Sequence, residues 1–137
     1  MFTNASALAG RAALSAIFLW SAHGKFQAPD AVMGYIASYG VPHPQLAYVA
    51  ALLAECVGGV LILLGPGARW ASLALAGFCL ATAVIFHRQF GDQNELIHAL
   101  KNLAIAGGLL QLAAFGPGRW TIAALPWLRV RDAHARG

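Results

Sequence analysis

The sequence contains very few charged residues. Only 10% of its 137 positions are Asp, Glu, Lys or Arg, whereas an ordinary soluble domain has about 25%. Acidic residues are the scarcest, with five in the chain against nine Lys and Arg. So few charged side chains cannot cover the surface of a soluble globular protein, and this excludes a conventional water-soluble domain.

Reactive motifs are also scarce. The two cysteines lie in apolar runs without CxxC spacing, so we interpret them as small buried hydrophobic residues. There is no GxSxG, HExxH or phosphate-binding glycine loop, and no haem, flavin or iron–sulfur motif. Any electrons would therefore come from a partner protein. The basic residues are scattered singly near the ends of apolar runs, which favours membrane orientation over nucleic-acid binding.

Hydrophobic residues are abundant and make up 59% of the chain. They fall into four blocks close to the roughly 20 residues that a helix needs to cross the hydrocarbon core of a bilayer. The predicted spans are residues 8–26, 46–64, 70–86 and 96–115. The sequence predicts an all-α transmembrane four-helix bundle as a single domain over residues 1–125, followed by a basic cytoplasmic tail over residues 126–137.

The connection between the first two spans has structure-forming signals of its own. Pro29 and Asp30 are typical of a helix start, and Gly40 and Pro42 of a helix end. Apolar residues between them recur at three- and four-residue spacing. Two interpretations stay open: a short amphipathic helix in the first extracytoplasmic loop, or an ordered loop with some apolar contacts.

Small residues recur along the second and fourth spans at spacings that place them on one helix face. They are Ala47, Ala50, Ala51, Ala54, Gly58 and Gly59, and then Ala104, Gly107 and Gly108. Such faces let helix backbones approach closely in lipid. We therefore expect a tight bundle, and a homo-oligomer remains open.

The number of crossings fixes which loops share a side of the membrane. Four spans place both termini and the 65–69 turn on one side, here called face A, and the 27–45 and 87–95 loops on the other, face B. Basic residues favour face A, by Arg11, Arg69, Arg119, Arg129, Arg131 and Arg136 against Lys25, Arg88 and Lys101. The excess predicts an inner-membrane protein with face A and both termini in the cytoplasm.

Several polar side chains stand within or beside the spans, where a central charge costs about 2.5–3.5 kcal/mol. They are Arg11, His23, Lys25, Glu55, His87, His98, Lys101 and Asn102. Glu55 lies at the middle of its span, roughly 13 Å from either end at 1.5 Å per residue. It is too deep for a carboxylate to reach water, so it must find a partner within the bundle or become protonated.

The topology collects these groups in the half of the bundle near face B. We predict a ligand-binding site made of Lys25, Glu55, His87, His98, Lys101 and Asn102. Glu55 and His87 are the candidates for catalysis. The alternative is a structural ion pair between Glu55 and a lysine, with the other side chains reaching the membrane surface.

Three further residues have separate expectations. Lys25 and His23 lie about 200° apart around their helix, so only one can face the core, and we expect Lys25. Arg11 lies in the first turn of its span, where we expect it to extend to the membrane surface. A metal site from His23, His87 and His98 is not expected, because the three have no recognisable ligand spacing.

The ordered set of these residues resembles the DoxX family of small four-helix membrane proteins, over about residues 8–121. The matching positions are Gly10-Arg11, Lys25, Gly40-Val41-Pro42, Glu55 with Gly58-Gly59, His87, and Lys101-Asn102 with Gly107-Gly108. The resemblance implies a four-helix inner-membrane protein related to the membrane subunit of thiosulfate:quinone oxidoreductase. It implies the fold more strongly than any reaction.

Two functional hypotheses follow. In the first, the chain is an accessory membrane subunit of a redox system with a soluble or periplasmic partner. Lys101, Asn102 or His87 would hydrogen-bond a quinone, and Glu55 or His87 would move its proton. In the second, the chain is a non-catalytic scaffold, a chaperone or a component that handles a small solute or a metal.

Overall fold

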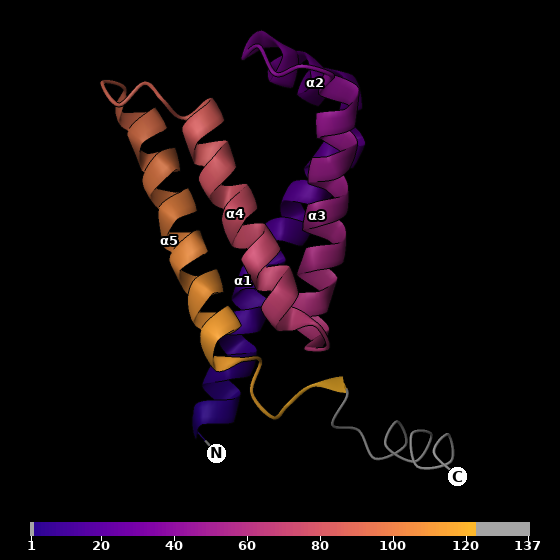
Figure 1. The fold of residues 1–137 in the computed structure, drawn as a ribbon, viewed down its shortest axis with the longest axis vertical. Helices are drawn as coiled ribbons and strands as arrows, with labels where there is room; N and C mark the ends of the chain where they lie inside the picture. The colour runs from indigo at the N-terminus through magenta and orange to yellow at the C-terminus, as the bar shows by residue number, and fades with distance from the viewer. Residues whose placement is uncertain (1, 123–137) are drawn as a thin grey trace.

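Four long helices and one short helix make up the part of the chain that the computed structural model describes, residues 2–122 (Figure 1). They are α1 (Phe2–Gln27), α2 (Pro29–Ser38), α3 (Pro44–Leu64), α4 (Ala68–Phe86) and α5 (Gln93–Phe115). All except α2 are long and apolar enough to cross a membrane. The predicted all-α transmembrane bundle is confirmed. Each long helix begins a few residues before its predicted start, because polar first turns belong to the helix but are invisible to hydropathy.

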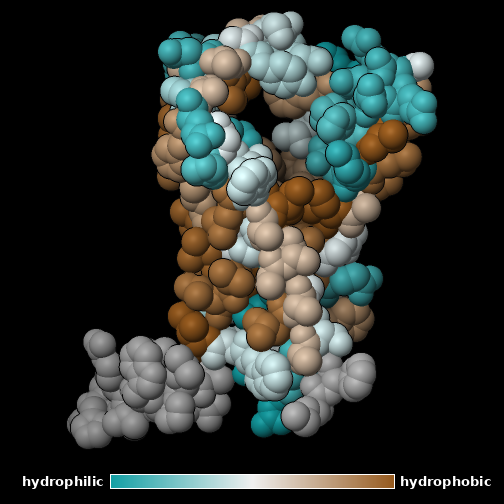
Figure 2. All heavy atoms as spheres, turned by 180° about the vertical axis from the view of Figure 1, so that it is seen from behind, coloured by the Kyte–Doolittle hydropathy of each residue, from teal (hydrophilic) through white to brown (hydrophobic). Residues whose placement is uncertain are grey.

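The path of the chain determines which segments lie at each end of the bundle. The N-terminus, the α3–α4 turn and the end of α5 lie at the lower end in Figure 1, and α2 and the α4–α5 connection lie at the upper end. These ends are faces A and B. Figure 2 shows hydrophobic atoms along the middle of the molecule and hydrophilic atoms gathered towards its ends. The tail over residues 126–137, with Arg129, Arg131 and Arg136, lies outside the described residues, and the assignment of face A to the cytoplasm stays a prediction.

The short helix α2 decides between the two interpretations of the first loop in favour of a helix. Pro29 occupies its first turn, where a missing backbone N–H costs nothing, and Gly40 with φ +74° follows its end. Ile36 is buried, while Ala37 and Ser38 are exposed. The helix is therefore amphipathic, and its apolar side faces the bundle.

Helix packing is tight only in the half near face A. Gly58 and Gly59 are buried there, and a Cβ on Gly58 would lie 2.7 Å from the side chain of Leu75. Leu75 belongs to a core with Ile62 and Leu109, all at most 1% exposed. The small residues at the start of α3 behave differently. Ala47, Ala50 and Ala51 border a cavity, and Ala54 borders it while also packing against the core. The expectation of a tight bundle therefore holds for Gly58 and Gly59, whereas Gly107 of α5 has no neighbouring atom within 4 Å of an added Cβ.

The structure contradicts the prediction that the Arg11 side chain extends to the membrane surface. The residue is 2% exposed, so its guanidinium is enclosed by protein instead of extending into water. Its Nε donates to the carbonyl of Ile62 over 2.9 Å, and its terminal nitrogens donate to the carbonyls of Leu63, Pro117 and Trp120. The last carbonyls of a helix have no partner within it. Arg11 supplies donors for the end of α3 and ties that end to the segment after α5.

Candidate functional site

A cavity of about 940 Å³ occupies the half of the bundle near face B. Residues from all five helices border it, and most of them are apolar. The polar members are Ser21, Lys25, Tyr35, Glu55, Thr82, His87 and Asn102. Figure 2 shows the surface hollowed near the upper end of the molecule. A mostly apolar cavity with a few polar groups and a volume near the upper end of the usual range of about 300–1,000 Å³ is typical of a site for a small organic molecule.

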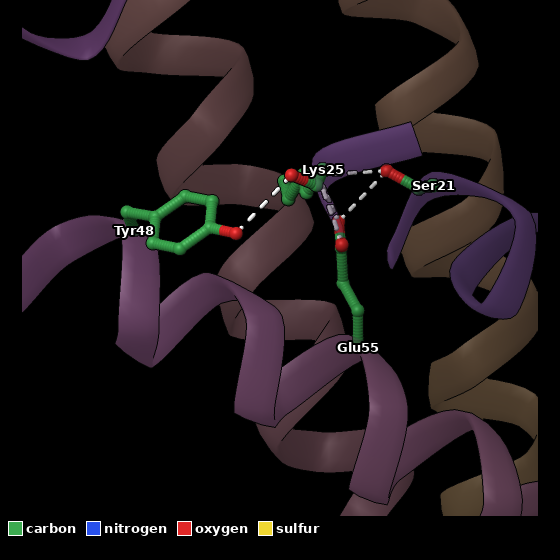
Figure 3. A network of polar contacts seen from close by, with 4 residues as sticks. All are labelled: Ser21, Lys25, Tyr48 and Glu55. Carbon is green, nitrogen blue, oxygen red and sulfur yellow. Dashed lines mark hydrogen bonds and ion pairs between the residues drawn. The ribbon is translucent and has the colours of Figure 1, made fainter. Parts of the chain in front are cut away.

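Lys25 of α1 and Glu55 of α3 form an ion pair at the wall of this cavity (Figure 3). Lys25 Nζ lies 2.9 Å from each carboxylate oxygen of Glu55 and donates a hydrogen bond to Oε1. The side chain of Glu55 is 4% exposed and that of Lys25 is 19% exposed. The pairing satisfies the requirement that a deep carboxylate find a partner. It selects Lys25, the expected one of the two residues that helix geometry does not allow to face the core together, over His23.

Two further side chains hold this pair in place. Ser21 lies one turn before Lys25 on α1, and its Oγ accepts from Lys25 Nζ over 2.8 Å and donates to Glu55 Oε1 over 3.0 Å. The hydroxyl of Tyr48 donates to the backbone carbonyl of Lys25 over 3.1 Å. Ser21 was not predicted as part of the site, although its position four residues before Lys25 on one helix face was a usable signal.

Asn102 of α5 and Thr82 of α4 form a second pair of hydrogen-bonded polar side chains. The Nδ2 of Asn102 donates to Thr82 Oγ1 over 3.3 Å, and Thr82 in turn donates to the carbonyl of Cys79. Both side chains border the cavity. Thr82 was not predicted, because a lone threonine in an apolar run carries no distinctive sequence signal.

His87 lies at the end of α4 and also borders the cavity. Its Nδ1 is 3.0 Å from Glu95 Oε2, and its ring stacks on His98 with centroids 5.1 Å apart. The side chains of His87 and Glu95 are 18% and 26% exposed. This pair therefore connects the face B surface with the cavity, while His98 is exposed and does not border it.

Lys101 does not join the predicted site. It is exposed and absent from the cavity wall, whereas the next residue, Asn102, borders the cavity. Consecutive helical residues lie about 100° apart, and only one sector of α5 faces the cavity. His23 is also exposed and contacts Gln27 through its side chain. Within residues 2–122 no group of three His, Cys, Asp or Glu is arranged to hold a metal ion.

Three aromatic rings connect α2 with α4 beside the cavity. Tyr35 stacks on Phe86 with centroids 5.5 Å apart, and Tyr39 meets the same ring edge-on at 5.2 Å. Partial burial of the phenol, in a residue that stays 46% exposed, then contact with Tyr39 and the charge of Glu95, raises the pKa of Tyr35 to about 12. The rings therefore close part of the cavity with neutral aromatic surface.

Comparisons with known proteins agree with this architecture. A family model named DoxX matches residues 6–88. The inner membrane protein YqjF of Escherichia coli K12 is 36% identical over 115 residues, which are 84% of this chain and 87% of YqjF. The inner membrane protein YphA of the same organism is 36% identical over 116 residues, 81% of this chain and 83% of YphA. No solved structure matches the chain. The chain belongs to the DoxX family and is an integral inner-membrane protein with four spans.

Proposed function

We propose that the protein binds a quinone or a similar lipid-soluble carrier in the cavity, as the membrane subunit of a redox system. The observation that carries this proposal is the cavity itself, whose walls are apolar except for a few hydrogen-bonding side chains. A quinone combines an apolar ring and tail with polar oxygens, so it matches walls of this kind.

The polar side chains of the cavity have distinct roles in this proposal. Lys25 supplies a cationic donor for a ligand oxygen, in the role that the sequence predicted for Lys101. Asn102 offers its amide to the other end of the ring. His87, paired with Glu95 and bordering the cavity, is placed to move a proton between the ligand and the face B surface.

Electron transfer needs a partner in this proposal. The sequence has no haem, flavin or iron–sulfur motif, so the chain would pass ligand-borne electrons to or from a separate redox protein. With face A in the cytoplasm, the cavity would lie in the periplasmic half of the inner membrane. A periplasmic partner is therefore proposed over a cytoplasmic one.

The proposal is tested by purifying the protein in mild detergent and extracting bound quinone for chromatography. Wild-type protein is expected to carry quinone, and Asn102→Ala and Glu55→Gln are expected to reduce its amount per mole of protein. Lys101→Ala is the matched control, because its charge lies on the same helix as Asn102 and outside the cavity. Quinone content that is nil in wild type, or that Lys101→Ala lowers as much as Asn102→Ala, would count against the site.

One observation favours the non-catalytic alternative. Lys25, Glu55 and Ser21 form hydrogen bonds with one another between α1 and α3, as expected of an ion pair whose role is purely structural. In that case Glu55→Gln would lower the unfolding midpoint in detergent, and the wild-type protein would hold no quinone. Quinone content and the unfolding midpoint together distinguish a binding site from a purely structural ion pair.

A further inference from the structure

We infer that a second site, at the face A end of the bundle, binds the phosphate and an adjoining acyl chain of an anionic phospholipid. This site lies at the opposite end from the cavity near face B, and it does not depend on quinone binding. It is carried by a groove of about 400 Å³ whose described walls contain two arginines and no carboxylate.

The groove is formed where the chain after α5 meets α1 and α3. From the end of α5 the chain crosses the lower end of the bundle (Figure 1), and the side chain of Thr121 packs against Gly65 at the end of α3. The backbone N–H of Arg119 donates to Asn4 Oδ1 of α1 over 3.3 Å. Residues of α1, the last residues of α3 and residues 119–122 border the groove. Contacts between distant parts of the chain therefore shape it.

The apolar part of the groove suits an acyl chain. Leu8, Leu63, Leu64 and Ile122 line it and are partly exposed. Trp120, which is 47% exposed, lines it as well. Aliphatic side chains bind hydrocarbon, and tryptophan rings favour the level of the lipid headgroups. The groove therefore combines a surface for an acyl chain with a ring typical of the membrane interface.

The charged part of the groove suits an anion. Arg119 is exposed, and its guanidinium has no hydrogen-bond or ion-pair partner within residues 2–122. Arg11 is enclosed and bonds backbone carbonyls, so it acts on a ligand through its charge and not through a hydrogen bond. The acidic residues that the structure describes all lie in the half near face B: Asp30, Glu55, Asp92 and Glu95. The two arginines therefore lack a carboxylate counterion in this part of the chain.

An anionic phospholipid matches both parts of the groove. Its phosphate can accept two parallel hydrogen bonds from the exposed guanidinium of Arg119. Its acyl chain can cover the leucines beside it, which a free phosphate ion leaves exposed. Basic pockets between membrane helices bind lipid headgroups in this way. A zwitterionic lipid brings its own cation and gains less from the two arginines.

The experiment measures lipid binding to the full-length protein in detergent by native mass spectrometry. Phosphatidylglycerol and phosphatidylcholine with the same acyl chains are offered at equal concentrations. A basic residue near an anionic headgroup contributes about 1 kcal/mol, which corresponds to about 5-fold in affinity. Wild-type protein is therefore expected to bind phosphatidylglycerol at least about 5-fold more tightly than phosphatidylcholine. Arg119→Ala is expected to lower the affinity for phosphatidylglycerol about 5-fold, and Arg119→Lys, which keeps the charge, to retain most of it.

Arg69→Ala is the matched control, because Arg69 is exposed at the same end of the bundle but does not line the groove. It is expected to keep the preference. Equal binding of the two lipids by wild-type protein, or equal losses in Arg69→Ala and Arg119→Ala, would overturn the site in favour of general attraction to a basic surface. Glycerol phosphate is the competitor without acyl chains. If it displaced phosphatidylglycerol at equal concentration, the ligand would be a soluble phosphate and not a lipid.

Discussion

Arg11 is the residue whose replacement should cost the most stability outside the cavity. The substitution Arg11→Met keeps a long side chain and removes donors from four backbone carbonyls. Two of these belong to the last turn of α3, at Ile62 and Leu63, where the helix offers them no other donor. Each carbonyl left unpaired costs about 1–3 kcal/mol, so this helix end alone loses about 2–6 kcal/mol.

The assay is unfolding by increasing SDS in mixed micelles, followed by far-ultraviolet circular dichroism. Arg119→Ala is the matched control, since this arginine lies at the same end of the bundle but is exposed, and its loss should change the free energy of unfolding by less than about 0.5 kcal/mol. Arg11→Met as stable as this control would refute the view that the buried guanidinium links the end of α3 to the chain after α5.

Three further predictions concern the ion pair, the helix contact and the aromatic rings. Lys25→Met should destabilise the protein by about 3–5 kcal/mol in the same SDS titration, because it leaves Glu55 buried without its cation; combining it with Glu55→Leu should restore most of the loss, and two additive losses would contradict the coupling. Gly58→Ala should cost about 1–3 kcal/mol, because its Cβ would lie 2.7 Å from a buried leucine side chain. Gly107→Ala, with no neighbouring atom within 4 Å of its Cβ, should be neutral or stabilise by up to about 1 kcal/mol. Equal changes in stability for Gly58→Ala and Gly107→Ala would exclude the close contact between Gly58 and the leucine. The folded state favours the protonated form of Tyr35, whose pKa is raised to about 12. This preference stabilises the fold at pH values below the ordinary tyrosine pKa of about 10, and the stabilisation is lost as the pH rises towards 12. The midpoint temperature of thermal unfolding should therefore fall more steeply between pH 9 and about 12 for wild type than for Tyr35→Phe. Parallel curves of midpoint against pH would contradict this prediction.

The cavity exists because small and large residues are distributed unevenly along α3. Near face A, Gly58 and Gly59 meet large side chains of neighbouring helices and leave no space. Near face B, Ala47 and Ala50 border the cavity. The same residue class therefore closes one half of the bundle and opens the other, because a small side chain allows contact only where a neighbour supplies the missing volume.

The sequence by itself determined the membrane spans, their antiparallel order, the two faces and the depth of Glu55. Hydropathy and turn chemistry are local properties, and a chain that crosses a bilayer with a buried carboxylate must pair or neutralise it. These constraints were sufficient to predict a polar site in the half of the bundle near face B, and to prefer Lys25 to His23.

Only the tertiary structure decided which groups meet. It paired Glu55 with Lys25 and left Lys101 outside, and it buried Arg11 against carbonyls far along the chain. The rotation of each helix about its axis follows from packing against segments distant in sequence, and a rotation of about 100° moves a neighbouring residue from the cavity to the lipid. Local sequence patterns do not contain that angle, so they placed the polar groups at the right depth without identifying their partners.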